Sequence, residues 1–336
     1  MIEKSLDVLA IGNAIVDVLA PAEEATLSAL DLPKGGMQLI EEADIARIYA
    51  AMGPAQQRSG GSAANTVAGI ASLGGRAGFI GRVADDEFGE IFVHDIRAIG
   101  VAFNSTPVTD AEPTARCLIF VTPDGQRTMN TYLGCSPSLD RSEITADQIA
   151  RAEILYLEGY LYDRPEAQAA FDSACAIAAD TGTRVALSLS DTFCVERHKE
   201  AFTTLIEEHV DILFANEHEI AALSDTDNLT SAAEQIAGEK RIVAMTCGAN
   251  GSYVVAGAGP DAGSEKHHIL SHPVEEVVDT TGAGDLYAAG FLHGLAQGHK
   301  IETCGKLGSI AAAEVIGHMG ARPEISLRAL VESQKL

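Results

Sequence analysis

The sequence lacks several patterns that mark common classes of protein. No GxxxxGK[ST] stretch occurs, so a P-loop NTPase is not indicated, and no GxGxxG follows the first expected strand, which weighs against a Rossmann dehydrogenase. No run of about 18 apolar residues is present, so we expect no transmembrane helix. The cysteines include no CxxC pair, which argues against zinc knuckles and thioredoxin-type sites. We expect reduced, mostly buried thiols at Cys117, Cys135, Cys175, Cys194, Cys247 and Cys304.

Basic residues are also scarce. The chain has 23 Lys and Arg against 48 Asp and Glu, a formal net charge of −25. Such a surface repels nucleic acid and anionic membranes, so we expect neither as a partner. It remains compatible with ATP, because backbone N–H groups and Mg²⁺ can neutralise phosphates locally. The N-terminus shows no basic segment followed by an apolar stretch and a cleavage site, so we expect a cytoplasmic protein.

What is present is an alternation of short apolar runs and helix-like stretches. With 336 residues, 46% of them hydrophobic, the chain can form one large domain with a small appendage. The runs read as buried parallel strands at 6–11, 77–80, 154–157, 185–189, 212–214 and 242–245. Helical spacing appears between them at 63–73, 166–180 and 284–296. This order predicts an α/β fold, a doubly wound and mainly parallel sheet flanked by helices.

Two insertions break the alternation. Residues 14–41 and 101–135 are richer in turns and β-like sequence, and 116–121 and 127–133 predict a hairpin around Asp124-Gly125. We interpret the insertions as a small β-sheet lid over a core made of 1–13, 42–100 and 136–336.

The strongest chemical signal is the segment from Asp279 to Asp285, DTTGAGD, which leads into a helix. Two glycines at a turn that enters a helix let backbone N–H groups converge on an anion. A carboxylate at that place, Asp285, would repel a phosphate unless it accepted a proton, which suggests a general base for phosphoryl transfer. The alternative is an ordinary aspartate cap on a glycine-rich turn.

Two further motifs offer groups for a polyol. Gly61 and Asn65 belong to SGGSAANT at 59–66, where paired glycines permit close approach of a ligand. Asn13 and Asp17 follow the first strand, at the edge of the sheet where α/β proteins bind ligands, and could grip a vicinal diol. The alternatives are a capped loop-to-helix junction and simple turn chemistry.

Two motifs near the C-terminal strands suit a nucleotide. Asn216 and Glu219 share one helical face after the strand at 212–214, and such oxygen donors suit Mg²⁺, often through water. Thr246, Gly248 and Gly251 form a turn that could cradle phosphates. The alternatives are a capped surface helix and an Asn-Gly turn between strands.

Together these motifs resemble the ribokinase-like family, also called the PfkB carbohydrate kinases, over nearly the full chain. Within the family the layout is most similar to the adenosine kinase members, through 12–17, 210–219 and 320–324. The resemblance implies Asp285 as catalytic base and an anion hole at Gly282, Ala283 and Gly284. It implies contacts to the acceptor from Asn13, Asp17, Gly61 and Asn65. It further implies an ATP and Mg²⁺ site at Asn216, Glu219, Thr246, Gly248 and Gly251. In some members K⁺ binds beside the anion hole, where Asp279 and Thr281 would be its neighbours.

The lid and Ser62 narrow the range of acceptors that we expect. Ribokinase-type members carry a lysine soon after the paired glycines, and its absence lowers the case for ribose. An apolar and aromatic lid suits a flat nucleobase, with candidate contacts at Met37, Leu39, Cys117, Tyr132 and Leu133. These residues could instead form the core of the lid itself. Arg116 or Arg127, if directed into the cleft, could hold a phosphate or carboxylate of the acceptor; otherwise they lie on a solvated hairpin face.

The sequence thus predicts an ATP-dependent kinase that phosphorylates a hydroxyl of a small molecule, with adenosine as the leading acceptor. A sugar or sugar-acid kinase of the same family is the first alternative. A non-catalytic nucleoside- or nucleotide-binding protein is the second. We expect a monomer or a homodimer, the latter formed through the lid sheet.

Overall fold

The computed structural model describes residues 3–259 and 264–334 and contains two β-sheets. The large sheet has nine strands in the order β14-β13-β12-β11-β10-β9-β1-β5-β6. Its strands are β1 (Leu6–Ile11), β5 (Ala77–Ile80), β6 (Ala102–Phe103), β9 (Ala152–Glu158), β10 (Arg184–Ser188), β11 (Ile212–Asn216), β12 (Ile242–Thr246), β13 (Ser252–Gly257) and β14 (Ser264–Ile269). All neighbours pair in parallel except at β13 and β14. The predicted fold class is confirmed.

Helices cover both faces of this sheet because its strands are apolar on both sides. In β1, Val8 and Ala10 face one hydrophobic cluster, while Leu9 and Ile11 face the other. The first cluster includes α3 (Ser62–Ser72), α10 (Ala283–Ala296), α11 (Ile301–Ile316) and α12 (Leu327–Ser333). The second includes α5 (Ala146–Ala150), α6 (Pro165–Thr181), α7 (Thr192–His209), α8 (Glu217–Ser224) and α9 (Leu229–Ala237).

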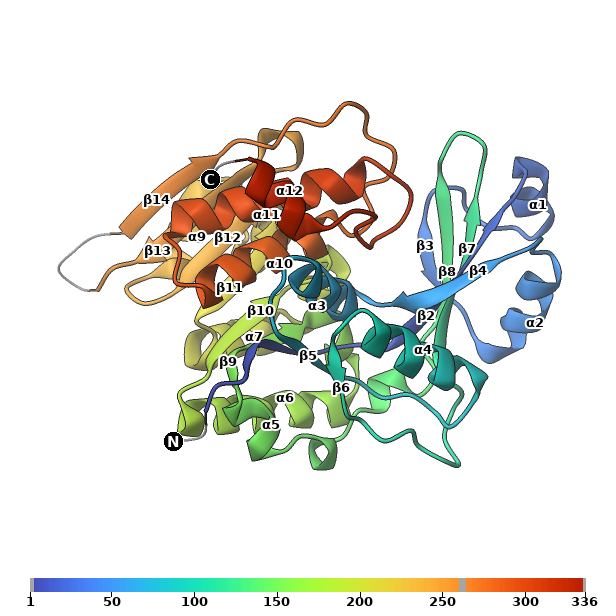
Figure 1. The fold of residues 1–336 in the computed structure, drawn as a ribbon, viewed down its shortest axis with the longest axis horizontal. Helices are drawn as coiled ribbons and strands as arrows, with labels where there is room; N and C mark the ends of the chain where they lie inside the picture. The colour runs from blue at the N-terminus through green and yellow to red at the C-terminus, as the bar shows by residue number, and fades with distance from the viewer. Residues whose placement is uncertain (1–2, 260–263, 335–336) are drawn as a thin grey trace.

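The small sheet is the lid, and it stands beside the larger body (Figure 1). Its order is β3-β8-β7-β2-β4, from β2 (Ile15–Pro21), β3 (Met37–Leu39), β4 (Gln56–Gly60), β7 (Ala115–Val121) and β8 (Arg127–Tyr132). The hairpin of β7 and β8 is confirmed, with Gly125 at φ +80° in its turn. One face of the lid packs on α1 (Glu24–Ala29) and α2 (Glu42–Ala50).

Two strands lie on the other side of the predicted boundaries. β4 falls in the segment assigned to the core, yet it pairs with β2 in the lid. Its sequence, QQRSG, has no apolar run, so only the pairing reveals it as a strand. β6 falls in the segment assigned to the lid, yet its two residues pair with β5 in the large sheet.

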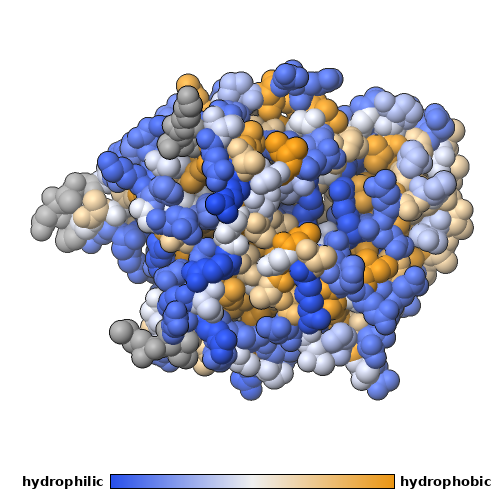
Figure 2. All heavy atoms as spheres, in the orientation of Figure 1, coloured by the Kyte–Doolittle hydropathy of each residue, from blue (hydrophilic) through white to orange (hydrophobic). Residues whose placement is uncertain are grey.

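The surface and the cysteines agree with the composition. Hydrophilic side chains cover most of the face shown in Figure 2. All six cysteines are free thiols, and five of them are buried. Across residues 3–259 and 264–334, no helix combines the length and the apolar character needed to cross a membrane.

Candidate active site

A cavity of about 570 Å³ lies between the carboxyl ends of the central parallel strands and the inner face of the lid. Most candidate residues from all five motifs line it, although they are up to 272 positions apart in the chain, as Asn13 and Asp285 are. The predicted residues on its wall are Asn13, Asp17, Met37, Leu39, Gly61, Ser62, Asn65, Cys117, Arg127, Leu133, Asn216, Glu219, Thr246, Thr281, Gly282, Ala283, Gly284 and Asp285.

Asp285 lies in the first turn of α10 and is partly buried in this wall. Both of its carboxylate oxygens accept hydrogen bonds from α3, one from Ser62 Oγ at 2.6 Å and one from Asn65 Nδ2 at 3.0 Å. Burial outweighs these bonds and raises the pKa of Asp285 to about 6. A carboxylate with that pKa is deprotonated at neutral pH but is a better proton acceptor than an ordinary aspartate.

The turn before Asp285 forms part of the cavity wall. Gly282 has φ +79°, and a Cβ there would lie 2.7 Å from the Cβ of Ala321, so only glycine fits. At Gly284 a Cβ would meet no atom within 4 Å, which leaves open space above the start of α10. The N-terminus of a 14-residue helix facing an open space is suited to an anion.

Asp279 holds this turn in place. Its Oδ1 accepts from Thr281 N at 3.0 Å and Thr281 Oγ1 at 2.7 Å, and its Oδ2 accepts from Gly320 N at 2.9 Å. Arg127 Nε of the lid lies 2.9 Å from the same Oδ2. Both carboxylate oxygens are therefore used by protein groups, and a monovalent-cation site at Asp279 and Thr281 stays a prediction.

Glu158, at the end of β9, is a buried carboxylate that the sequence analysis missed. It accepts from Asn13 Nδ2 at 2.7 Å and from Ala63 N at 2.7 Å, and burial raises its pKa to about 7. Asn13 Oδ1 in turn accepts from Ser136 Oγ at 3.0 Å. Both ends of the Asn13 amide are thus hydrogen-bonded within the protein. The side chain therefore holds this part of the cavity wall in place and has few hydrogen-bonding positions left for a ligand. No sequence motif marked Glu158, because it ends an ordinary apolar strand.

Gly60 and Gly61 allow the lid to meet the core closely. A Cβ at Gly60 would lie 2.4 Å from Asp17 Oδ2, which is how this carboxylate reaches the cavity wall. Gly61 has φ +99°, and a Cβ there would lie 2.3 Å from the carbonyl oxygen of Asn13. Gly61 therefore has a structural reason to be glycine as well as a place in the cavity.

Gly61→Ala is expected to lower the free energy of unfolding by about 3 kcal/mol or more, because it adds a backbone clash to an unfavourable φ. Urea denaturation measures this change. Gly100→Ala is the matched control, since Gly100 has φ +90° but open space around it, and it should show the conformational part alone. Equal losses of unfolding free energy in the two variants would contradict a role for the backbone clash at Gly61.

The inner face of the lid is set by strand alternation. On β7, Cys117 and Ile119 line the cavity, and on β8 Arg127, Met129 and Thr131 do so. Side chains at the intervening positions point to the opposite face. Figure 1 shows β7 and β8 lying side by side in the small sheet.

Tyr132 is therefore not a contact of the cavity, and that prediction was wrong. It lies on the other face with Arg116, whose guanidinium is 5.8 Å from the Tyr132 ring and 4.6 Å from the Phe88 ring. Because Arg127, Met129 and Thr131 of β8 line the cavity, Tyr132 at the next strand position points the other way.

Arg127, in contrast, faces the cavity and is 7% exposed. Its Nε is ion-paired with Asp279, while its Nη2 has no hydrogen-bond partner. Buried guanidinium donors without partners are unusual, and a ligand anion would satisfy them.

Asn216 and Glu219 form a capping box at the start of α8. Asn216 Nδ2 donates to Glu219 Oε1 at 2.6 Å, and Glu219 N donates to Asn216 Oδ1 at 2.9 Å. Burial raises the pKa of Glu219 to about 7. Within the described residues, no group of three or more His, Cys, Asp and Glu side chains is placed to hold a metal ion. The pair caps the helix at the edge of the cavity, so a metal there would be held through water or phosphate oxygens.

Of the three residues predicted around the turn after β12, only the first lines the cavity. Thr246 lines the cavity, whereas Gly248 and Gly251 do not. Gly251 has φ +86°, and a Cβ there would lie 1.9 Å from the carbonyl oxygen of Ile269. This glycine permits the close approach of β13 to the segment after β14. Its role here agrees with the alternative reading of the motif, a turn between strands.

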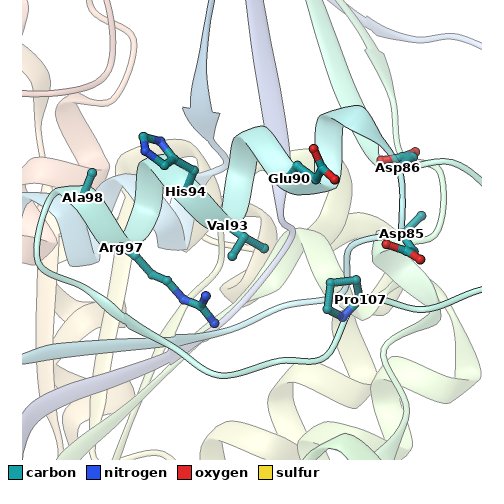
Figure 3. A pocket seen from close by; sticks show the side chains of 9 residues that line it. Asp85, Asp86, Glu90, Val93, His94, Arg97, Ala98 and Pro107 are labelled. Carbon is teal, nitrogen blue, oxygen red and sulfur yellow. The ribbon is translucent and has the colours of Figure 1, made fainter.

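A second, open cavity of about 580 Å³ lies over α4 (Glu87–Ala98), away from all these residues. Figure 3 shows Arg97 directed toward the loop that carries Pro107. Arg97 donates to the Phe103 carbonyl from Nε at 2.9 Å and Nη2 at 2.7 Å, and Asp86 caps α4 by accepting from Gly89 N at 2.8 Å. These two polar side chains of the second cavity, Arg97 and Asp86, thus serve the fold.

Comparisons with known proteins agree with this arrangement. Residues 45–327 match the pfkB family carbohydrate kinases. A crystal structure of adenosine kinase from Sinorhizobium meliloti is 47% identical, covers 98% of this chain and 99% of its own, and superposes with a TM-score of 0.89. A structure of a probable sugar kinase from Rhizobium etli CFN 42 is 43% identical, covers 99% of each chain, and has a TM-score of 0.90. A 5-dehydro-2-deoxygluconokinase from Shouchella clausii is 30% identical over 82% of this chain and 86% of its own. The chain belongs to the PfkB family of ribokinase-like kinases.

Proposed function

We propose that this kinase transfers the γ-phosphoryl group of ATP to a hydroxyl of adenosine, with Asp285 as the general base. The observation that carries the proposal is the position of Asp285. Its carboxylate, with a pKa of about 6, lies beside an open anion cradle in a cavity that is large enough for a nucleoside. The likeness to the Sinorhizobium meliloti adenosine kinase at 47% identity supports the choice of acceptor.

The chemistry follows from these positions. The acceptor hydroxyl donates its hydrogen to Asp285, and its oxygen forms a bond to the γ-phosphorus as the bond to the β-phosphate oxygen breaks. The proton passes to Asp285, and ADP leaves. Backbone N–H groups of Gly284 and Asp285 oppose the charge on the transferring group, whereas Ala283 N donates to the Thr280 carbonyl at 3.2 Å. A closed lid excludes water as a competing acceptor.

The cavity has space and a few polar residues suited to a nucleotide and Mg²⁺. The open space at Gly284 is a cradle that a Cβ would fill, and Thr246, Asn216 and Glu219 border the same cavity. Glu219 would hold Mg²⁺ there through water, and the ion would reduce the charge of the phosphates. Arg127 carries unpaired donors toward the same space and could bind a phosphate oxygen.

A flat apolar ligand is favoured by the lid and the cavity mouth. Met37 and Leu39 of β3 are 48% and 58% exposed although they line the cavity, and Phe193 of α7 is 68% exposed there. Apolar side chains left open to solvent at a cavity mouth can pack against a nucleobase. Asp17, on the inner face of β2, remains available to the hydroxyls of a ribose.

A sugar acid or sugar phosphate is the second candidate acceptor. The observation in its favour is Arg127, whose buried donors could pair with an anionic group of the acceptor instead of the nucleotide. The likeness to 5-dehydro-2-deoxygluconokinase supports the same class.

An acceptor panel separates these functions. ADP release from MgATP should be measured with adenosine, other nucleosides, ribose, fructose and 2-keto-3-deoxygluconate. We expect kcat/KM for adenosine to exceed that for each sugar by at least about 100-fold, because a site that pairs with a nucleobase loses those contacts with a bare sugar. Preference for a sugar or sugar acid would replace adenosine as the acceptor. Tight binding of adenosine without ADP release would favour the non-catalytic alternative.

A further inference from the structure

A line of hydrogen bonds runs from α4 to the carboxylate of Asp285 through the C-terminal segment. Asp95 Oδ2 accepts from Ser59 N at 2.7 Å and from Ser59 Oγ at 2.6 Å. Arg322 Nη2 donates to Ser59 Oγ at 3.1 Å, and Arg322 Nε donates to Asn65 Oδ1 at 2.8 Å. Asn65 Nδ2 then donates to Asp285 Oδ2 at 3.0 Å. Arg322 is the middle member of this line.

Arg322 determines which end of the Asn65 amide faces Asp285. A guanidinium carries donors only, so the atom of Asn65 beside it must be the oxygen. The amide nitrogen is then directed at Asp285, which accepts it. Without Arg322, rotation of the amide by 180° would place the Asn65 oxygen against the carboxylate, and two acceptors would face each other. Asn65 is 5% exposed, so water has little access to correct the arrangement.

Arg322 also supplies positive charge near the carboxylates of the cavity. Burial lowers the pKa of Arg322 to about 10, so the side chain is still charged at neutral pH. The charged groups near it are Asp17 on β2, Arg58 on β4, Asp95 on α4 and Asp285 on α10, with Glu158 on β9 also facing Asp285.

Of these charged groups, Arg322 lowers the pKa of Asp285, whereas Asp17 raises it. Removing the Arg322 charge should therefore raise the pKa of Asp285 further.

Arg322 does not line the cavity, although its neighbour Ala321 does. A ligand in the cavity would touch Asp285 and Asn65, and Arg322 would act only through them. A substitution of Arg322 can therefore change the orientation of the base without removing a direct contact to the substrate.

We propose that Arg322 is a positioning residue for phosphoryl transfer, which orients the Asn65 amide toward Asp285 and keeps the Asp285 carboxylate ionised at neutral pH. The proposal rests on the proposed function of Asp285 as the base. If Arg322 only anchored the C-terminal segment to Ser59, its loss would change stability and leave the pH dependence of catalysis unchanged.

The test is a series at position 322 that separates charge from hydrogen bonding. Arg322→Met removes both, Arg322→Gln keeps a donor without charge, and Arg322→Lys keeps both in part. For each variant, kcat and KM should be measured with MgATP and adenosine, or with whichever acceptor the panel selects, from pH 5 to 8.5, together with thermal unfolding. Arg328→Met is the control for net charge, because Arg328 is exposed on α12 and pairs with Glu332.

We expect Arg322→Met to lower kcat about 10- to 100-fold at neutral pH. KM should change less than about threefold, because Arg322 does not line the cavity. The acidic limb of the kcat profile should move up by about one pH unit, since a nearby positive charge lowers the pKa of a carboxyl group. Arg322→Lys should return the limb toward its wild-type position, whereas Arg322→Gln should recover part of kcat without moving the limb back.

An Arg322→Met protein that is folded, with kcat within about threefold of wild type and an unmoved acidic limb, would overturn the proposal. If Arg322→Met does not fold, the comparison of Arg322→Gln with Arg322→Lys decides, because only the latter should keep the wild-type limb. Asp285→Asn is measured in parallel. An active Asp285→Asn enzyme would show that the base assignment, and not the role of Arg322, has failed.

Discussion

Replacing Asp285 with asparagine is expected to lower kcat by about 10²- to 10⁴-fold, the effect of losing a general base. Asparagine has nearly the same shape, so the start of α10 and the contacts with Ser62 and Asn65 are disturbed little. It cannot, however, take the proton of the acceptor hydroxyl. Steady-state ADP release under saturating MgATP and acceptor measures the change.

The pH profile of the wild-type enzyme gives an independent test of the same residue. Burial raises the pKa of Asp285 to about 6, so the base becomes protonated as pH falls through that value. We therefore expect kcat/KM, which reports the free enzyme, to be about half-maximal near pH 6, to decline below that pH and to level off toward neutral pH. Residual activity of Asp285→Asn should show no such limb.

Asp147→Asn is a matched control for this substitution. Asp147 lies on α5, is well exposed, and pairs with Arg151 far from the cavity. Its variant should keep wild-type kcat. If Asp285→Asn retained kcat within about tenfold of the wild type, a different group would have to accept the proton.

Gly284→Ala is expected to lower kcat by about 10²-fold or more while leaving the fold intact, which is the scale of removing one donor from an anion hole. A Cβ at Gly284 meets no protein atom within 4 Å, and alanine is favoured over glycine in a helix. Stability should therefore stay the same or rise slightly. The new methyl group would instead occupy the space in which the cradle receives phosphate oxygens.

Gly53→Ala controls for this change, because a Cβ at Gly53 also meets nothing within 4 Å and lies outside the cavity. Activity and the midpoint of urea unfolding should be measured for both variants. Full activity of Gly284→Ala would show that the cradle does not hold the transferring group. A loss of activity that matched a loss of folded protein would show that Gly284 serves the backbone instead.

The amino-acid sequence by itself determined the class of the fold and marked the turn on which the proposed chemistry rests. Apolar runs such as Leu6–Ile11 appear as strands because their side chains must be buried on both faces, a property of the residues themselves. The turn with Gly282, Gly284 and Asp285 could be recognised for a similar reason, since conformational freedom and a carboxylate at a helix start are local properties.

Tertiary structure decided the features that depend on pairing and on packing between distant segments. The strand β4 exists because β2 pairs with it, and strand register places Arg127 inside the cavity and Tyr132 outside it. Glu158 and Arg322 gain their roles from neighbours 95 and 257 positions away, at Ala63 and Asn65. No local pattern encodes such contacts, because they arise only when the folded chain brings a buried donor and a buried acceptor together.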